Sequence, residues 1–224
     1  MLLEGPRVVR EAVDGGLQLE VLALGEGIGF EAPARRTVIL GKRAMAAASQ
    51  TVTPQGVLAI ARAETVPVSK AVEAARAAGW PLLVLDGVQD PGNVGTICRS
   101  AAAAGAPALT LLEGSADPLG AKAVRASAGT VFRLKVSRGG WEDLARLDGY
   151  AATASGGAPL QEAGLEAGQL LALGGETHGV RRRDLAPVTI PMAPGVGSLN
   201  VAAAAAVLLF ELRRRLESRD TRRA

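Results

Sequence analysis

The sequence predicts an α/β protein whose larger part is a parallel sheet covered by helices, preceded by a small mixed α/β unit. Two observations carry this prediction. From Trp80 onward, short apolar runs alternate with segments in which apolar residues recur at helical spacing, which is typical of a parallel sheet with helices on both faces. Three predicted strands are also followed by glycine-rich loops, and in such sheets ligands bind beyond the carboxyl ends of the strands.

Residues 1–65 form the small unit in this prediction. Its pattern indicates a helix, two strands, a second helix and a third strand, at 6–15, 19–24, 37–40, 42–48 and 56–61. A polar loop at 49–56 joins the second helix to the last strand. Four basic residues of the unit can either meet phosphates or remain solvated loop charges: Arg35, Arg36, Lys42 and Arg43.

A proline-flanked, alanine-rich helix at 66–79 is predicted to link the small unit to the larger one, which occupies residues 80–224. Strands are predicted in the larger unit at 81–85, 108–112, 131–136, 149–153, 170–173 and 188–190. Its glycine-rich loops are 89–95, 174–179 and 191–198. None matches the G-x-G-x-x-G fingerprint and no GKS or GKT triplet ends a phosphate loop, which argues against nicotinamide and nucleoside triphosphate sites.

The segment 85–106 is expected to form a strand end, a tight turn and a helix, which is the geometry of a ligand site. Asn93 is placed to cap this helix. Helical side chains lean toward the N-terminus, so Arg99 should lie over Gly95 and Thr96, where the glycine leaves room for the guanidinium. The alternative is a surface arginine paired with a nearby carboxylate.

The last element is predicted to be a helix at 199–216, capped by Ser198 or Asn200. Its first half, 201–210, is apolar on every face, so we expect it to be buried all round, at a subunit interface or inside the fold. A basic run follows, which can bind RNA or be a solvated helix end favoured by the helix dipole. It consists of Arg213, Arg214, Arg215, Arg219, Arg222 and Arg223.

Composition narrows the possible functions. The balance of 25 basic to 22 acidic residues permits a nucleic-acid partner without requiring one. The single cysteine, Cys98, lies on the apolar face of a predicted helix, which argues against disulfides and for a reducing cytoplasm. The single histidine, His178, excludes most zinc and Ser-His-Asp chemistry. No signal segment opens the chain and the longest apolar run is too short to span a bilayer, so neither secretion nor a membrane location is expected.

Three motifs in order resemble those of the SpoU (TrmH) family of RNA ribose 2′-O-methyltransferases, which belong to the SPOUT superfamily. They are LDGVQDPGNVG at 85–95 with Arg99, LGGE at 173–176 with Gly179, and IPM at 190–192 with SLN at 198–200. The segment VRASAG at 124–129 also resembles the family. The small unit, with TPQGVLA at 53–59, is similar to the RNA-binding domain, related to certain ribosomal proteins, that precedes the catalytic domain in many members.

The resemblance implies a fold, a cofactor and an assembly. The family fold is an α/β sheet with a C-terminal trefoil knot, a feature otherwise almost absent from proteins. It binds S-adenosylmethionine in the knot and works as a homodimer, which would explain the apolar last helix. The implied catalytic residues are Asn93, Arg99, Glu176, Ser198 and Asn200. The implied cofactor contacts are Thr153, Ala154, Leu173, Gly174, Gly175, Glu176, Gly179, Ile190, Met192, Ser198 and Leu199. The implied RNA contacts are Arg35, Arg36, Arg43, Gln55, Arg99 and Arg125.

The chemistry fits these residue types. A sulfonium methyl is already electrophilic, so no metal is expected, and the protein must align a ribose hydroxyl and help to remove its proton. Arg99 is the family's candidate base, but a guanidinium stays charged, so we expect it to hold the target phosphate and stabilise the alkoxide. Glu176 is expected to orient Asn93 or backbone groups. Ser198 and Asn200 can be catalytic or simple helix caps.

The sequence therefore predicts an enzyme that methylates ribose 2′-hydroxyls of ribosomal RNA, because the small unit resembles a ribosomal RNA reader. Two alternatives stay open, namely a transfer RNA methyltransferase and a family member that binds RNA without turnover. Two sites depart from the family pattern: Gly197 replaces a common acidic residue, and Thr177-His178 replaces small or acidic residues. His178 is either incidental to its loop or a local variation beside the cofactor.

Overall fold

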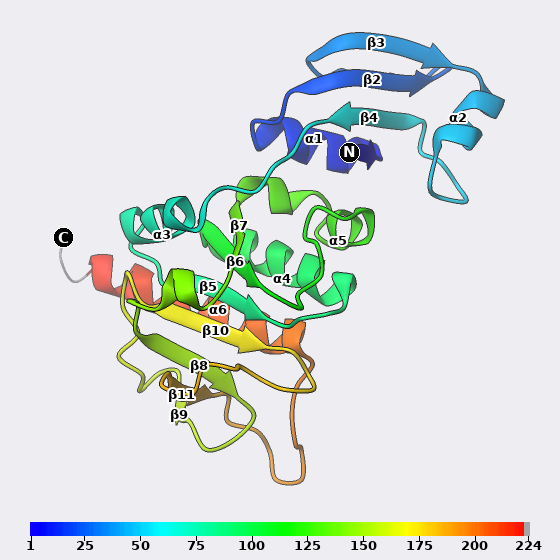
Figure 1. The fold of residues 1–224 in the computed structure, drawn as a ribbon. Helices are drawn as coiled ribbons and strands as arrows, with labels where there is room; N and C mark the ends of the chain where they lie inside the picture. Colours follow the sequence, from blue (N-terminus) through cyan, green and yellow to red (C-terminus); the bar gives the residue numbers. More distant parts are fainter. Residues whose placement is uncertain (222–224) are drawn as a thin grey trace.

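A computed structural model describes residues 1–221 of the chain, and the side chains of residues 1–218 (Figure 1). Two sheets organise it. The four-stranded sheet has the strand order β1-β4-β2-β3 and is built from residues before Val66. The seven-stranded sheet has the order β7-β6-β5-β10-β8-β11-β9, and every neighbouring pair is parallel. The predicted parallel α/β sheet is confirmed.

The small sheet packs one face against helix α1 (Pro6–Asp14), which buries Val8, Val9 and Ala12. Its strands are β1 (Leu2–Glu4), β2 (Leu19–Gly25), β3 (Ala34–Leu40) and β4 (Val57–Ala61), and helix α2 (Lys42–Ala48) covers part of the other face. Strand β1 was not predicted, because its three residues are too few to show an alternating pattern.

The two sheets share one continuous core through α1. This helix packs against η1, a 3-10 helix at Thr130–Arg133, so closely that a Cβ on Gly129 would lie 2.8 Å from the Cβ of Glu11. Arg133 bonds Glu11 and lies 3.6 Å from Asp14 at the rim of this contact. Its pKa is raised, mainly by the hydrogen bond to Glu11. The prediction of a strand at 131–136 is therefore partly wrong. Val131 and Phe132 are buried in η1, against α1, and the strand begins only at Lys135.

Helices cover both faces of the large sheet. Alternate residues of β5 point to opposite sides, so Leu83 and Leu85 join the core beneath α4 and α6, while Leu82 and Val84 pack with α3. The strands are β5 (Leu82–Asp86), β6 (Ala108–Leu112), β7 (Lys135–Gly139), β8 (Gly149–Thr153), β9 (Ala158–Pro159), β10 (Leu170–Gly174) and β11 (Ala186–Thr189). The helices are α3 (Val68–Ala77), α4 (Pro91–Ala104), α5 (Ala121–Ala126), η2 (Glu142–Leu144) and α6 (Val201–Thr221). The predicted linker helix, α3, is thus part of this helical layer.

Helix α6 packs against α4 and β10 and buries one face (Figure 1). Of the two alternatives for the apolar half of this helix, burial inside the fold is wrong, because Val207 and Phe210 are each 48% exposed. Burial at a subunit interface stays a prediction. Ala203, Val207 and Phe210 recur at helical spacing and leave an apolar stripe open to solvent.

The arginines that end α6 are bonded within the fold. Arg213 donates to the Ala103 carbonyl at 3.0 Å, and Arg214 pairs with Glu211 at 2.7 Å. Arg215 donates to the carbonyls of Leu160 and Ala163 at 2.6 and 2.7 Å. The side chains of Arg219, Arg222 and Arg223 lie outside the described residues. Arg213 and Arg215 therefore fasten the helix end to its neighbours, while Arg214 is paired within the helix.

Within residues 1–221, no helix is both long and apolar enough to cross a membrane. The described residues also contain no group of three or more His, Cys, Asp or Glu side chains placed to hold a metal ion.

Candidate active site

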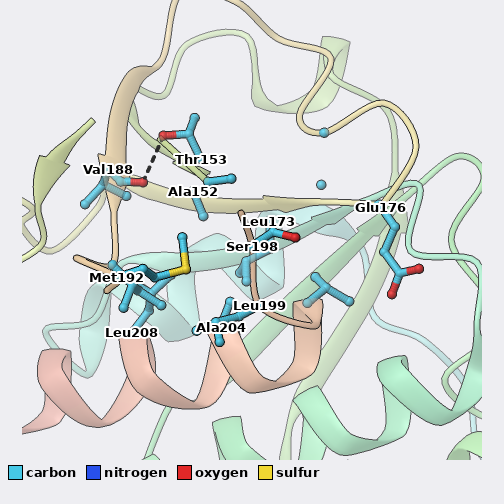
Figure 2. Close-up of a pocket in the computed structure, with 16 residues that line it drawn as sticks. Ala152, Thr153, Leu173, Glu176, Val188, Met192, Ser198, Leu199, Ala204 and Leu208 are labelled. Carbon is cyan, nitrogen blue, oxygen red and sulfur yellow. Dashed lines mark hydrogen bonds between the residues drawn. The ribbon is translucent and has the colours of Figure 1, made fainter. Parts of the chain in front are cut away.

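A cavity of about 240 Å³ lies at the carboxyl ends of β8, β10 and β11, against the first turns of α6 (Figure 2). All eleven residues that the sequence suggested for the cofactor line it, from three loops that are far apart in the chain. The remaining wall was not predicted, because it depends on where α6 packs. That wall consists of Ala152, Val188, Val201, Ala204 and Leu208.

A second, smaller cavity adjoins the first at the end of β5. Gly175, Glu176 and Val201 line both cavities, and the second is completed by 87–90, Asn93 and Thr177. Glu176 therefore lies where the two spaces meet, and in Figure 2 it is at the opposite end of the first cavity from Met192. Two ligands can meet at this boundary, one in each space.

Three predicted catalytic side chains form a chain of hydrogen bonds at this boundary. Asn93 donates from Nδ2 to Oε1 of Glu176 at 3.4 Å, and its Oδ1 accepts from Nδ2 of Asn200 at 3.2 Å. Asn200 in turn accepts the backbone N–H groups of Ala202 and Ala203 at 2.9 and 3.3 Å. Asn200 is thus both the cap of α6 and a member of the polar chain. Ser198 lines the first cavity and has no hydrogen bond within the described residues.

Helix α4 is capped by Asp90, so the prediction that Asn93 caps it is wrong. The Oδ2 of Asp90 accepts the backbone N–H of Asn93 at 3.1 Å, and Pro91 occupies the first turn. Lys122 of α5 donates to the other carboxylate oxygen at 2.7 Å, and this bond is the main cause of the lowered pKa of Asp90. Because Asp90 caps the helix, the Asn93 side chain is free for its bonds to Glu176 and Asn200.

Arg99 is exposed on α4 and lines neither cavity. The space at Gly95, expected to receive Arg99, is filled by α5, where a Cβ on Gly95 would lie 2.3 Å from the Ala123 carbonyl oxygen. That expectation is wrong, because the glycine serves helix packing. The alternative of a carboxylate partner is not found either, since Arg99 has no hydrogen bond or ion pair with any described residue. Its guanidinium is available to a ligand from solution.

One buried polar residue that shapes the site was missed in the sequence. Ser115, after β6, accepts the N–H groups of Gly87 and Val88 at 3.0 and 3.2 Å and donates to the Leu85 carbonyl at 3.0 Å. It fixes the turn that leads to Asn93. The only local signal was a serine just after an apolar run, and its partners lie almost thirty residues away.

Apart from Arg99 on α4, the predicted RNA residues are spread over the small unit and α5. Arg35 pairs with Glu20 at 3.3 Å, while Arg36, Arg43 and Gln55 are exposed. Arg125 donates to Oε1 of Gln50 at 3.4 Å, which joins α5 to the loop at 49–56. Glu4 holds the base of that loop by accepting the hydroxyls of Ser49 and Thr51 and the N–H of Gln50. His178 is exposed and lines neither cavity.

Comparison with known proteins agrees with this geometry. The model of the SpoU rRNA methylase family matches residues 81–210, which contain both cavities and the polar chain. The chain belongs to the SpoU rRNA methylase family. It is 33% identical over 95% of its length to the Bacillus subtilis 23S rRNA (guanosine(2553)-2′-O)-methyltransferase RlmP, and covers 88% of that protein. It is 30% identical to the human mitochondrial rRNA methyltransferase 3, of which the match covers 56%.

Two solved structures share the fold of this SpoU family chain over almost its whole length. The AdoMet-bound rRNA methyltransferase from Sinorhizobium meliloti superposes with a TM-score of 0.79 at 27% identity, covering 96% of this chain and 87% of that one. The SpoU methyltransferase AviRb from Streptomyces viridochromogenes superposes with a TM-score of 0.80 at 24% identity, covering 97% and 91%. The small unit and the large sheet both lie within these matches.

Proposed function

We propose that this chain transfers a methyl group from S-adenosylmethionine to a ribose 2′-hydroxyl of ribosomal RNA. The observation that carries the proposal is the hydrogen-bonded chain of Glu176, Asn93 and Asn200 at the boundary between two cavities. Such a boundary suits a reaction in which a group passes from one bound molecule to another. Relatives named as guanosine 2′-O-methyltransferases of 23S rRNA support ribosomal RNA as the substrate and guanosine as the nucleoside to test first.

The residues of the first cavity fit S-adenosylmethionine. Leucine, isoleucine, methionine and valine side chains provide apolar walls for a purine, and the loops at 174–179 and 190–199 offer backbone donors and acceptors. Glu176 is the one ionisable side chain in the lining and can attract a cationic group. The AdoMet-bound neighbour from Sinorhizobium meliloti adds support. When bound, the cofactor supplies a methyl group on a positively charged sulfur, which needs no metal for its activation.

The polar chain is suited to orienting the acceptor. Asn93 lines the second cavity, and its amide is held from both sides, by Glu176 and by Asn200. An amide fixed in this way presents its remaining hydrogen-bonding capacity in one direction and positions a ribose hydroxyl without reorganisation. We assign Glu176 the task of holding Asn93. The proton of the ribose hydroxyl then passes to solvent water as the oxygen bonds the methyl group and the sulfur becomes neutral.

Arg99 completes the proposed site as a ligand for RNA. A guanidinium keeps its charge and forks toward phosphate oxygens, which suits it to hold the target phosphate and to stabilise a developing alkoxide. Its exposure and its lack of a partner within the described residues support this role over that of a base.

The small unit is proposed to bind the RNA outside the reacting nucleotide, as its resemblance to a ribosomal RNA reader implies. Arg125 and the loop at 49–56 touch each other, so the loop, α5 and the start of α4 provide one continuous surface. Arg36, Arg43 and Gln55 are exposed and available for contacts on the same unit. Arg35 is the least available of the predicted set, because it is paired with Glu20.

The assembly and the knot belong to the same proposal. The exposed stripe of Ala203, Val207 and Phe210 on α6 supports a homodimer, because burying it would cover an apolar helix face. The path of the chain supports the trefoil knot, since α6 returns to pack against both α4 and β10 after the long loop at 190–200. A cytoplasmic location is proposed from the reduced, buried Cys98.

The deciding experiment is methyl transfer from labelled S-adenosylmethionine to three substrates: ribosomal RNA, transfer RNA and an unstructured RNA. Label in the ribose of ribosomal RNA supports the proposal, and the variant Asn93→Ala should abolish it. Label only in transfer RNA would correct the substrate. Cofactor binding by calorimetry without transfer to any RNA would show a binding protein in place of an enzyme.

A further inference from the structure

A buried carboxylate links two loops beside the cofactor cavity. Asp86 ends β5, and its side chain is fully buried. Its Oδ2 accepts the backbone N–H of Arg181 at 2.6 Å and the indole N–H of Trp141 at 3.2 Å. Its Oδ1 accepts Nε and Nη2 of the Arg181 guanidinium at 2.7 and 2.6 Å. Four donors therefore converge on one carboxylate, and a single charged partner neutralises it.

Arg181 directly follows the loop at 174–180, which lines the cofactor cavity. The loop enters from β10, where the N–H of Gly175 donates to the Asp86 carbonyl at 2.8 Å. It closes on itself where Gly179 N–H donates to the Gly175 carbonyl at 3.0 Å. Its exit is then tied to the Asp86 side chain by Arg181. One residue of β5 thus fastens both ends of the loop that carries Glu176.

The loop has little other support. Glu176, Thr177, His178 and Gly179 are all exposed, and the only buried side chain among these described loop residues is that of Val180, at the end of the loop. The glycines at its entrance pack backbone against backbone, and a Cβ on Gly174 would lie 1.9 Å from the Gly179 carbonyl carbon. The guanidinium of Arg181 also donates to the Glu113 carbonyl at 2.8 Å, which ties the loop to β6.

We propose that Asp86 and Arg181 are positioning residues that hold the loop at 174–180 in the shape that binds the cofactor and orients Glu176. The proposal rests on the proposed function. Neither residue lines the cofactor cavity, so their effect passes through the loop. We call the Asp86–Arg181 pair the clasp. Loss of the clasp should weaken cofactor binding and loosen the hydrogen bond between Glu176 and Asn93.

The test uses Arg181→Gln. The Arg181 side chain is 46% exposed, so a shorter glutamine at this position does not crowd the core. Arg213→Gln is a matched control: Arg213 is also 46% exposed and also bonds a carboxylate and a backbone carbonyl, but at the far end of α6. Calorimetric titration should give a dissociation constant for S-adenosylmethionine that rises at least about tenfold in Arg181→Gln, the loss of a charge-assisted bond pair. Arg213→Gln should stay within about twofold of the wild type.

A second arm separates positioning from stability. Arg181→Gln leaves a buried, unpaired carboxylate and should lower Tm, whereas Asp86→Asn combined with Arg181→Gln should restore Tm. Positioning predicts that the double variant still binds the cofactor weakly; a purely structural role predicts that affinity recovers together with Tm. Hydrogen exchange in the cofactor-free protein should be faster at Gly175 and Gly179 in both variants, because the N–H groups of these two residues are hydrogen-bonded in the wild type.

The outcomes distinguish the two proposals. If the wild type binds no S-adenosylmethionine, the proposed function fails, while the hydrogen-exchange arm still tests the clasp. If the wild type binds and both variants bind equally well with unchanged exchange in the loop, the clasp is overturned.

Discussion

The Nδ2 of Asn200 donates to the Oδ1 of Asn93 at 3.2 Å, so the side chain that caps α6 also holds a side chain from the first turn of α4. The two residues are 107 positions apart. A single asparagine therefore ties the start of the last helix to the polar centre of the site, and its two functions can be separated by substitution.

Asn200→Asp should keep the cap and lose the donor to Asn93. We expect kcat/KM for methyl transfer to fall by up to about tenfold, the value of one hydrogen bond, with Tm unchanged. Asn200→Ala should lose both functions and also reduce the free energy of unfolding by about 1 kcal/mol. Equal loss of stability in the two variants would argue against the cap, and equal activity in Asn200→Asp would argue against the polar chain.

Arg99→Ala and Arg99→Lys should both impair transfer without affecting folding, because Arg99 is exposed and has no partner within the described residues. Lysine keeps the charge but cannot fork toward a phosphate, so we expect at least about a tenfold loss of kcat/KM even in Arg99→Lys. Steady-state kinetics at two salt concentrations would measure this. If Arg99→Lys kept near-full activity, the forked contact with phosphate would be wrong and Arg99 would act only through its positive charge.

Gly95→Ala should separate α4 from α5, since its Cβ would lie 2.3 Å from the Ala123 carbonyl oxygen. Overpacking of this kind costs about 1–3 kcal/mol, and the Asp90–Lys122 pair should be strained with it. Urea unfolding measures the loss. Gly29→Ala is the control, because no atom lies within 4 Å of its Cβ position; equal stability of the two variants would contradict the packing role.

Phe210→Glu should prevent the proposed homodimer, because it places a charge in the exposed apolar stripe of α6. Sedimentation velocity should show a dimer for the wild type and a monomer for the variant. Ile39→Glu is the control, since Ile39 is 63% exposed on β3 of the small sheet. A dimer that survives Phe210→Glu and dissociates with Ile39→Glu would move the interface to the small unit.

Cys98 gives the folded state a defined pH dependence. Burial raises the pKa of its thiol from the ordinary 9.0 to about 12. The unfolded chain releases this proton first, so the contribution of the thiol to stability is complete below pH 9 and is lost as the pH rises toward 12. Relative to Cys98→Ala, the free energy of unfolding of the wild type should fall by up to about 1.4 kcal/mol for each pH unit above pH 9. Parallel urea titrations between neutral and alkaline pH test this, and a constant difference would contradict it.

Much of the fold and the cofactor cavity could be predicted because both follow from local patterns. Buried strands such as 81–85 are continuous apolar runs, and the site loops come directly after strands. Asp90 could have been recognised as the cap, because a cap residue directly before Pro91 is the stronger signal than Asn93. Asp86 and Ser115 could not, since each is one polar residue whose partners lie elsewhere in the chain. The sequence left two alternatives for α6, a subunit interface or the interior of the fold, because an apolar pattern does not distinguish burial within a chain from burial between chains.

The core shared by α1 and η1 bears on which nucleotide of a long RNA reaches the site. Because the hydrophobic core continues across the contact between α1 and η1, which the Glu11–Arg133 pair borders, the loop at 49–56 and the polar centre around Asn93 belong to one packed body. Under the proposed function, the small unit binds the RNA at one place and the larger unit holds the methyl donor at another. Only a nucleotide at the matching distance and angle from the bound RNA segment then reaches the reaction site.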